Sequence, residues 1–282
     1  MFNKISVVIP TYNRIKFLLR AIESVMKQTY PIHEIIVVDN NSSDNTPKII
    51  KDKYSGINVL LQNKQGVSYA RNQGIKIANG DWIALLDSDD LWKPEKIEKQ
   101  LILYENSDKS RRIIHTNELW YRNGIQLNQK NKHKKSGGYI FENCVKLCCI
   151  SPSSALLRSD LFEDIGYFDV EFPTCEDYDF WLRVSLKEKV LFVDEPLTLK
   201  FGGHDDQLSK KYWGMDRFRV KALEKLIFNC SLNIYQKKIV LHTLLIKLKI
   251  ITDGAKKRKN YEVEEFYRTK IDHWTNYKYE NI

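Results

Sequence analysis

An acidic run in the first third of the chain has the residue types and spacing to hold a metal ion beside a phosphate group. The segment ALLDSDDLW, residues 84–92, ends an apolar stretch with Asp87, Asp89 and Asp90. Mg²⁺ and Mn²⁺ prefer oxygen ligands, and they commonly bind through one or two carboxylates plus substrate phosphates. The D-x-D spacing of Asp87 and Asp89 therefore fits a divalent metal that neutralises a diphosphate. Each acid could equally be a turn residue, and Asp90 is expected to cap the next helix, which Pro94 indicates is starting.

Polar groups also follow two other segments that have the pattern of buried strands. Residues 11–14 (TYNR) follow the first of them, and residues 39–41 (DNN) follow the second. The carboxyl ends of parallel strands meet at one edge of an open sheet, where ligands bind. No G-x-G-x-x-G follows a predicted strand and no G-x-x-x-x-G-K-[ST] occurs, so a glycine loop is not the expected phosphate binder. The three polar clusters together predict a binding site at this edge.

Alternating strand and helix patterns must position these residues. The predicted strands are residues 5–10, 34–39, 57–62 and 81–87, and the predicted helices are residues 14–28, 44–54 and 66–79. Strands and helices that alternate with short connections form a parallel sheet with helices on its faces. Asp44 is expected to cap the second helix, and Gly80 to end the third. The predicted fold class is therefore α/β.

The middle of the chain is less regular. The expected elements are helices over 94–104 and 139–149 and from near Cys175, strands over 111–122 and 153–158, and a polar loop over 128–138. That loop has the composition of a lid or an exposed hairpin. A hydrophobic fraction of 43% in 282 residues allows a large core. Five cysteines, without paired C-x-x-C spacing, argue against a disulfide framework and a zinc site, and they favour a reducing compartment.

Four motifs, taken in order, make the chain resemble a known family. They are ISVVIPTYNR (5–14), EIIVVDNNSSDNT (34–46), GVSYARNQGIKIANGDWIALLDSDDLW (66–92) and CEDYDFWLRV (175–184). Together they resemble the family 2 glycosyltransferases over residues 3–205. The resemblance implies the GT-A fold, which is a Rossmann-like αβα sandwich with a mostly parallel sheet. It also implies an inverting, non-processive enzyme of the hexosyltransferase type.

Carried over residue by residue, the resemblance implies a nucleotide-sugar site at the predicted sheet edge. The residues expected to bind the donor are Pro10, Thr11, Tyr12, Arg14, Asp39, Arg71, Asp87 and Ser88. Asp39 would accept a hydrogen bond from the base, with Arg71 beside it. The family often has a second Asp and a Gly after this position, where the chain has Asn40 and Asn41. Asn tolerates the left-handed backbone that Gly would supply, so the turn can survive, while details of base recognition stay open.

The resemblance also implies the residues of the metal site and of the chemical step. Asp87 and Asp89 would face the ribose and a Mn²⁺ or Mg²⁺ ion, with His204 as a further ligand or else an ordinary surface residue. Asp177 would take the proton of an acceptor hydroxyl that attacks the anomeric carbon, while the metal stabilises charge on the diphosphate.

The second acidic motif also contributes residues expected on the acceptor side, Glu176 and Trp181. Asp179 is expected either to support the site or to contact the acceptor. Two structural alternatives apply. The acids could simply begin a helix, where they complement the helix dipole, and Trp181 could pack in the core.

The net charge of +9 belongs wholly to the C-terminal tail. From Gln207 onward, 17 Lys and Arg accompany 8 Asp and Glu, whereas residues 1–206 carry 28 of each. The domains expected are a catalytic domain over 1–206, with a nucleotide-sugar half (1–93) and an acceptor half (94–206), and a basic helical extension over 207–282. Helices are expected over 211–229, 233–252 and 260–271, with a break over 253–260. Their positive face fits either a solvated surface packed on the catalytic domain or an anionic membrane surface, and no nucleic-acid motif occurs.

We therefore expect a cytoplasmic glycosyltransferase, free or peripheral on the inner face of the cell membrane. It would transfer sugar from a nucleotide-sugar, most simply a UDP-sugar, to a glycan or lipid-linked acceptor in cell-surface polysaccharide synthesis. The apolar runs are too short for a signal peptide or a membrane span. The alternative is a nucleotide-sugar-binding or scaffolding protein on the same fold. A nucleotidyltransferase would open with a glycine-rich loop, and a processive synthase would carry Q-x-x-R-W and membrane spans, and neither pattern occurs.

Overall fold

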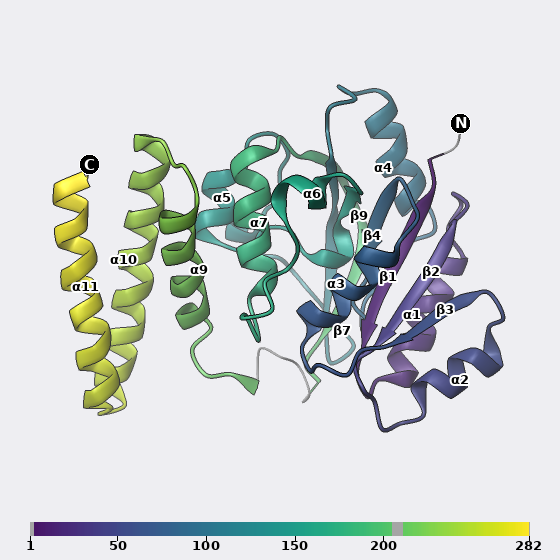
Figure 1. Cartoon of the computed structure of the whole chain (residues 1–282), viewed down its shortest axis with the longest axis horizontal. Coiled ribbons are helices and arrows are strands. Elements are labelled where there is room, and N and C mark those ends of the chain that lie inside the picture. The colour runs from purple at the N-terminus through teal and green to yellow at the C-terminus, as the bar shows by residue number, and fades with distance from the viewer. Residues whose placement is uncertain (1–2, 205–210, 282) are drawn as a thin grey trace.

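A mixed sheet with helices on both faces adjoins a bundle of three long helices (Figure 1). The computed structural model describes residues 3–204 and 211–281, and side chains as far as residue 277. The boundary predicted between residues 206 and 207 lies outside the described residues. No helix in the described ranges has the length and apolar character needed to cross a membrane.

The order of elements along the chain follows the predicted alternation in its first half. The strands are β1 (Ile5–Thr11), β2 (Glu34–Asp39), β3 (Ile57–Leu61), β4 (Trp82–Leu85), β5 (Leu91–Trp92), β6 (Ile113–Arg122), β7 (Ile125–Leu127), β8 (Leu156–Arg158) and β9 (Leu191–Gly202). The helices are α1 (Ile15–Met26), α2 (Thr46–Lys53), α3 (Val67–Ile77), α4 (Lys96–Glu105), α5 (Phe141–Lys146), α6 (Leu161–Ile165), α7 (Glu176–Lys187), α9 (Asp216–Asn229), α10 (Ile234–Lys257) and α11 (Tyr261–Asn281), with short 3₁₀ turns η1 (Asn131–His133) and η2 (Pro152–Ser154).

The first four strands form the parallel part of the sheet, in the order β3-β2-β1-β4. This confirms the parallel sheet predicted from the strand and helix alternation. The register places Thr11 opposite Asp39, and Asp39 opposite Leu61, so the carboxyl ends of β1, β2 and β3 lie level. The polar residues that follow these strands therefore gather at one edge.

The second half of the sheet mixes directions. Strand β8 pairs antiparallel with β4 and with β6, β9 runs parallel to β6, and the short β5 pairs antiparallel with β9. β7 returns beside β6 as a hairpin, and the polar loop that follows it is held at Lys135. The Lys135 ammonium donates to Cys149 O at 2.7 Å and lies 3.4 Å from the Glu118 carboxylate, so this end of the loop is anchored in the acceptor half.

Side chains from the two faces of the sheet enter two separate cores. Val7 and Ile9 of β1 pack with Leu18 and Ile22 of α1 on one face, whereas Val8 packs in the core that contains α3 on the other face. Strand side chains alternate between faces, so a strand covered on both sides is apolar throughout. This burial explains why the predicted strands read as unbroken apolar runs.

The helical C-terminal part predicted from the sequence is present and shares a core with α5, α6 and α7. Leu223 of α9, Leu244 of α10 and Trp274 of α11 belong to the same buried cluster as Phe180 of α7. Figure 1 shows α9, α10 and α11 side by side at the end of the molecule farthest from β3. Lys249 of α10 lies on the exposed side, whereas Lys225 of α9 and Lys247 of α10 pair with Asp179 and Asp216.

Several predicted helix boundaries differ from the structure, and the last helix, predicted to end at residue 271, continues to Asn281. Helix α10 continues to Lys257 through the predicted break, with Gly254 inside it. A glycine costs a helix about 1 kcal/mol relative to alanine, and the buried Ile251 and Ala255 on either side offset that cost. Helix α5, predicted over residues 139–149, ends at Lys146, so Cys148 lies beyond the helix.

The start of α2 is one residue later than predicted. Asn45, with φ of 59°, precedes the helix, while the Asp44 carboxylate still accepts a hydrogen bond from Thr46 N at 3.2 Å. The other Asp44 oxygen accepts from Ile15 N at 3.1 Å, the first residue of α1. Asp44 therefore ties together the starts of two helices rather than capping one.

Candidate active site

The turn after β2 forms one wall of the polar edge. Asn40 accepts a hydrogen bond from Gly66 N through Oδ1 at 2.8 Å and donates through Nδ2 to Gln62 O and Lys64 O. Asn41 adopts φ of 66°, the left-handed conformation expected of it. Asn40 thus organises the loop that leads into α3, and Asn41 supplies the turn in place of glycine.

Asp39 lies at the bottom of this edge with one oxygen unpaired. Its Oδ2 accepts from Ser42 N at 3.0 Å, whereas its buried Oδ1 has no hydrogen-bond partner among the described residues. The buried Thr11 Oγ1, on the neighbouring strand, also lacks one. Buried polar atoms are normally paired, so these two oxygens are the places where a ligand donor would be accommodated.

The remaining donor residues differ in how open they are. Tyr12 is 47% exposed beyond the end of β1, whereas Pro10 and Ser88 are buried. Arg14 precedes α1 and points its guanidinium to Asp89. The side chains of Tyr12 and Arg14 are therefore accessible to a ligand at this edge. Pro10 and Ser88 are buried, so their role is to set the course of the backbone.

Arg71 connects the donor edge to the start of α7. Its Nη2 donates to Asp87 Oδ1 at 2.6 Å and its Nη1 to Glu176 Oε1 at 2.5 Å, and the side chain is 4% exposed. The sequence placed Arg71 beside Asp39, but its observed partners are these two carboxylates. Burial acts to raise the pKa of Asp87, yet Arg71, Lys200 and Arg14 together outweigh it and hold that pKa below its ordinary value. For Glu176 burial prevails, and the pKa is raised.

Asp89 pairs with two groups from other parts of the chain. Its Oδ2 lies 2.7 Å from Arg14 Nη1 and 3.1 Å from His204 Nε2. The His204 ring also contacts Phe17 of α1, with ring centroids 4.9 Å apart. The structure therefore brings together the predicted metal residues Asp89 and His204, and it turns Asp87 toward Arg71 instead.

Asp90 does not cap the next helix, which corrects the prediction. The chain after it forms β5, and α4 begins only at Lys96, preceded by Glu95. The Asp90 carboxylate instead accepts from Ser153 Oγ at 2.6 Å and from Phe201 N at 3.1 Å. It also lies 3.2 Å from Lys200 Nζ, and burial raises its pKa to about 7.

The residues around Asp89 fit a divalent metal only if the substrate supplies further ligands. In the described part of the chain, no three or more His, Cys, Asp and Glu side chains cluster in a way that could hold a metal ion. Asp89 and His204 offer one carboxylate oxygen and one imidazole nitrogen. Mg²⁺ and Mn²⁺ sites of this kind are completed by water and by substrate phosphates, so the donor set is compatible with a metal that binds with its nucleotide.

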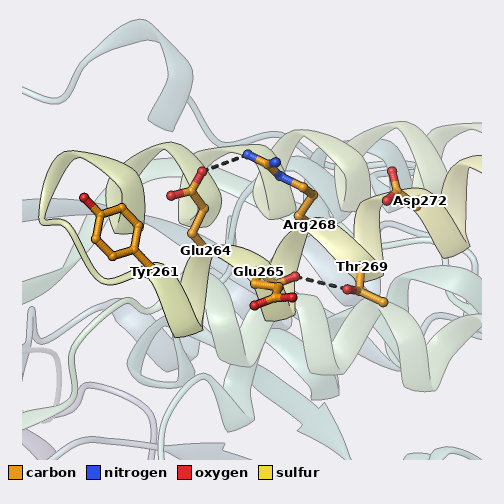
Figure 2. Close-up of a pocket in the computed structure, with 6 residues that line it drawn as sticks. All are labelled: Tyr261, Glu264, Glu265, Arg268, Thr269 and Asp272. Carbon is orange, nitrogen blue, oxygen red and sulfur yellow. Dashed lines mark hydrogen bonds and ion pairs between the residues drawn. The ribbon is translucent and has the colours of Figure 1, made fainter.

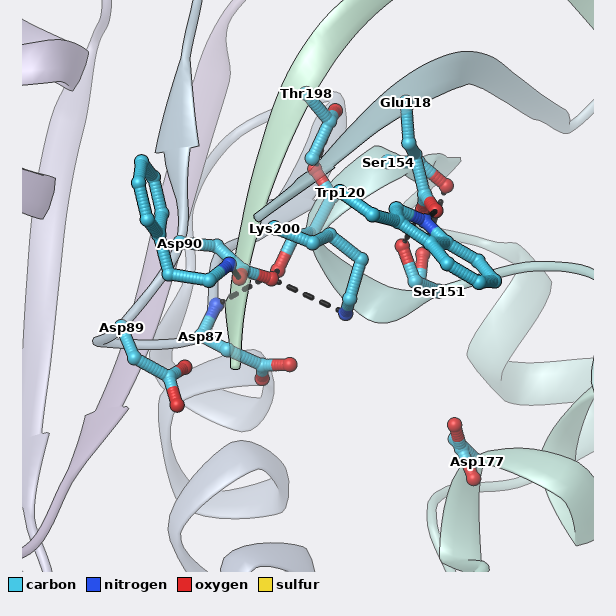
Figure 3. Close-up of polar contacts among 12 residues, drawn as sticks. Asp87, Asp89, Asp90, Glu118, Trp120, Ser151, Ser154, Asp177, Thr198 and Lys200 are labelled. Atoms are coloured by element: carbon cyan, nitrogen blue, oxygen red, sulfur yellow. Dashed lines mark hydrogen bonds and ion pairs between the residues drawn. The ribbon is translucent and has the colours of Figure 1, made fainter. Parts of the chain in front are cut away.

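Asp177 occupies the start of α7, across from the acidic run. In the view of Figure 3, the carboxylates of Asp87 and Asp89 lie on one side of Lys200 and that of Asp177 lies on the other. Asp177 Oδ1 accepts from Tyr178 N at 2.7 Å, and Oδ2 from Cys148 Sγ at 3.3 Å. Asp177 is thus the acid of the second motif that is not bound to a cationic partner by any contact in the described structure.

The other residues of the second motif are buried. Trp181 is fully buried, with its ring against Phe180, so the predicted acceptor contact is wrong and the core role applies. Glu176 is 5% exposed and bound to Arg71, which makes it a support of the site rather than an acceptor contact. Asp179 likewise supports the fold, because its Oδ1 lies 2.9 Å from Lys225 Nζ of α9.

Two charged residues of the site were missed from the sequence. Lys200 on β9 faces Asp90 and Glu118, and their charges, with those of Asp87 and Asp89, raise its pKa against the lowering effect of burial. Glu118 on β6 accepts from Trp120 Nε1 at 2.7 Å and from Ser151 Oγ (Figure 3). Charged residues inside the apolar runs of β6 and β9 were the available signal, since a buried strand rarely carries a charge without a partner.

A hollow on α11 is unrelated to this edge. Figure 2 shows that it is lined by residues of one helix, with an ion pair between Glu264 and Arg268 at 2.8 Å. Its lining residues are Tyr261, Glu264, Glu265, Arg268, Thr269 and Asp272. α11 lies at the opposite end of the molecule from the donor strands (Figure 1), so the hollow plays no part in the site.

The fold and the polar edge define the GT-A class, and comparison with solved structures agrees. The structure matches the S. aureus protein TarS, solved with UDP-GlcNAc, with a TM-score of 0.70 at 23% identity over 86% of this chain and 71% of that one. It also matches the mannosyltransferase PcManGT of Pyrobaculum calidifontis, solved with GDP-Man and Mn²⁺, with a TM-score of 0.64 at 14% identity over 98% of this chain and 85% of that one.

The family follows from the sequence comparison. The family model described as Glycosyl transferase family 2 matches residues 6–166. An uncharacterized glycosyltransferase of Bacillus subtilis, YwdF, is 33% identical over 66% of this chain and 70% of its own. The chain therefore belongs to glycosyl transferase family 2. Asp177 lies beyond the matched residues, so its role is not carried by this match.

Other relatives differ in length. An uncharacterized glycosyltransferase of Rickettsia felis is 32% identical over 69% of this chain, but the chain spans about a third of that relative and of two others from Rickettsia. The amylovoran biosynthesis glycosyltransferase AmsB of Erwinia amylovora is 29% identical over 73% of this chain and 74% of its own.

Proposed function

We propose that the chain transfers a sugar from a UDP-sugar to a glycan or lipid-linked acceptor by a metal-assisted, inverting single displacement. The acceptor oxygen forms a bond to the anomeric carbon as the bond from that carbon to the diphosphate breaks. The acceptor proton passes to the Asp177 carboxylate, and the electron pair of the broken bond leaves with the nucleoside diphosphate. One displacement at the anomeric carbon inverts its configuration.

The observation that carries this proposal is the double ion pair of Arg71. The guanidinium binds Asp87 of the donor edge and Glu176, the neighbour of Asp177, at 2.6 and 2.5 Å. A planar guanidinium holds two carboxylates in a defined geometry, so the donor edge and the start of α7 are held in one arrangement. This supports a mechanism in which donor and base act on the same reacting atoms.

The unpaired oxygens at the ends of β1 and β2 support a uracil-containing donor. Asp39 Oδ1 is an acceptor without a partner in the described part, and the imide N–H of uracil is a donor of matching kind. TarS, which has a similar fold, was solved with UDP-GlcNAc, and this also supports a UDP-sugar as the donor.

A divalent metal would be held by Asp89 and His204 together with the diphosphate. When bound, such an ion stabilises the negative charge that develops on the leaving diphosphate. The ion pair of Asp89 with Arg14 would have to rearrange, because one carboxylate oxygen now contacts both Arg14 and His204. Arg14 would then be placed to contact a phosphate.

The test of the base is the Asp177→Asn variant. We expect release of UDP from a UDP-sugar in the presence of acceptor to fall at least about 100-fold, with donor affinity retained, because general bases contribute 10²–10⁴-fold. Asp272→Asn, on the exposed side of α11, is the matched control. Unchanged turnover in Asp177→Asn, with the fold intact, would exclude Asp177 as the base and favour the binding-protein alternative.

The donor site is tested by thermal shift with UDP-, GDP- and dTDP-sugars, with and without Mn²⁺. We expect a UDP-sugar to raise the melting temperature more in Mn²⁺ than in EDTA, and Asp89→Asn to remove that difference. If no nucleotide-sugar gives a metal-dependent shift, the metal-assisted donor site is refuted.

The basic outer side of α10 supports attachment to an anionic membrane surface on the cytoplasmic side, which would suit a lipid-linked acceptor in cell-surface polysaccharide synthesis. Tyr235, Ile246 and Ile250 are 46–64% exposed there, and Lys249 is also exposed. Exposed apolar groups beside lysines are typical of surface-binding helices. We expect co-sedimentation with phosphatidylglycerol vesicles at low salt, lost in Lys249→Glu combined with Ile246→Ser. Absence of wild-type binding would leave the helices with a packing role only.

A further inference from the structure

The segment between α5 and η2 contacts the start of α7, where the Cys148 thiol lies next to the Asp177 carboxylate. Cys148 follows the end of α5 by two residues and is partly exposed. Its Sγ lies 3.3 Å from Asp177 Oδ2 and 3.4 Å from Ile150 O. No other side chain of the described residues forms a hydrogen bond to Asp177.

The thiol can donate to the carboxylate because it stays protonated. Burial raises the pKa of Cys148 well above its ordinary value, and the charge of Asp177 raises it further. A thiol has one proton, which the Asp177 carboxylate, as a charged acceptor, attracts more strongly than the Ile150 carbonyl. Cys148 is therefore a donor to Asp177 and not a nucleophile near neutral pH.

The two oxygens of Asp177 are held differently. Oδ1 accepts from Tyr178 N at 2.7 Å, which fixes one edge of the carboxylate to the helix backbone. Without Cys148 the carboxylate could still turn about its Cβ–Cγ bond, because Oδ2 has no other partner within the described ranges. The thiol thus restrains the orientation of the carboxylate from a second element.

We propose that Cys148 is a positioning residue for the catalytic base, in which the S–H group orients Asp177 toward the acceptor hydroxyl. This inference rests on the proposed role of Asp177 in sugar transfer. A thiol is a weak donor, so it orients the carboxylate while stabilising its charged form less than a hydroxyl or an ammonium would. The base keeps more of its affinity for the acceptor proton as a result.

The test compares variants that keep or remove the donor. We expect Cys148→Ala to lower kcat about 5- to 10-fold, which is the loss of one hydrogen bond of ordinary strength because a thiol is a weak donor, with KM for the donor unchanged. Cys148→Ser restores a donor and is expected to keep kcat within about threefold of wild type. Cys230→Ala, which removes a thiol that follows the end of α9 and has no hydrogen bond to Asp177 in the described structure, is the matched control.

The serine variant separates positioning from packing. A thiol that only fills space in a partly apolar setting would tolerate alanine at least as well as serine, because a buried hydroxyl needs a partner. Equal kcat in Cys148→Ala and wild type, or a lower kcat in Cys148→Ser than in Cys148→Ala, overturns the proposal. If Cys148→Ala does not fold, methyl methanethiosulfonate caps the thiol of the folded wild type, and it is expected to lower kcat there but not in Cys148→Ser.

A double variant distinguishes failure of this inference from failure of the proposed function. In an Asp177→Asn background, Cys148→Ala is expected to have no further effect on residual turnover, because the group that it positions is gone. A further fall in that background refutes the positioning role. If Asp177→Asn alone keeps full turnover, the proposed function fails instead, whatever Cys148 does.

Discussion

Replacing Arg71 by methionine removes the cation that two buried carboxylates share. Arg71 is 4% exposed, Glu176 is 7% and Asp87 is 24% exposed as side chains, so water cannot fully solvate the carboxylates that remain. Breaking a buried ion pair by removing one partner costs about 3–5 kcal/mol. At about 2 °C per kcal/mol for a chain of this size, Arg71→Met should melt about 6–10 °C below the wild type.

The loss should depend on pH with a defined sign. Burial raises the pKa of Glu176, and Arg71 opposes that rise, so removing Arg71 raises the pKa further. A carboxyl whose pKa is higher in the folded state stabilises it fully below the unfolded pKa and loses this contribution as the pH rises through the folded pKa. Arg71→Met should therefore be least destabilised near pH 5 and most destabilised near pH 8.

Urea unfolding at pH 5 and pH 8 measures both effects. Arg158→Met is the matched control, because Arg158 pairs with Asp160 where the side chains are 29% and 45% exposed, and exposed pairs contribute at most about 1 kcal/mol. Equal destabilisation by the two variants would refute the argument from burial. A larger loss at pH 5 than at pH 8 would refute the argument from the carboxyl groups. Arg71→Lys should recover only part of the loss, because one ammonium cannot bind both carboxylates as a guanidinium does.

Three further substitutions test single features. Gly74→Ala should destabilise by about 1–3 kcal/mol in urea, because an added Cβ would lie 2.4 Å from Val8 Cγ1, whereas Gly56→Ala, with open space around it, is the control and should be near neutral. Asn41→Ala should cost about 1 kcal/mol and Asn41→Gly almost nothing, since φ is 66°; equal losses would contradict the left-handed turn. Asp39→Asn should weaken UDP binding at least about tenfold in calorimetry, and unchanged affinity would show that Oδ1 does not accept from the base.

The sequence by itself was sufficient where the signal is local. Apolar β-branched runs predicted β1, β2 and β4, because a strand buried on both faces needs such side chains at every position. Asn41 was expected to replace glycine in its turn, which depends only on its own backbone preference. The position of Asp87 and Asp89 at a strand end likewise needed no knowledge of distant residues.

Only the tertiary structure decided which groups these residues meet. Arg71 and Glu176 are separated by 105 positions, and Cys148 reaches Asp177 from another element, so no local pattern encodes either contact. Asp90 was read as a helix cap because acids are favoured there, but burial beside Lys200 determined its role. Trp181, expected near the acceptor by its place in a motif, faces the core because of the side of α7 on which it lies. Propensity and spacing act within a few residues, whereas burial and ion pairing depend on how distant segments pack.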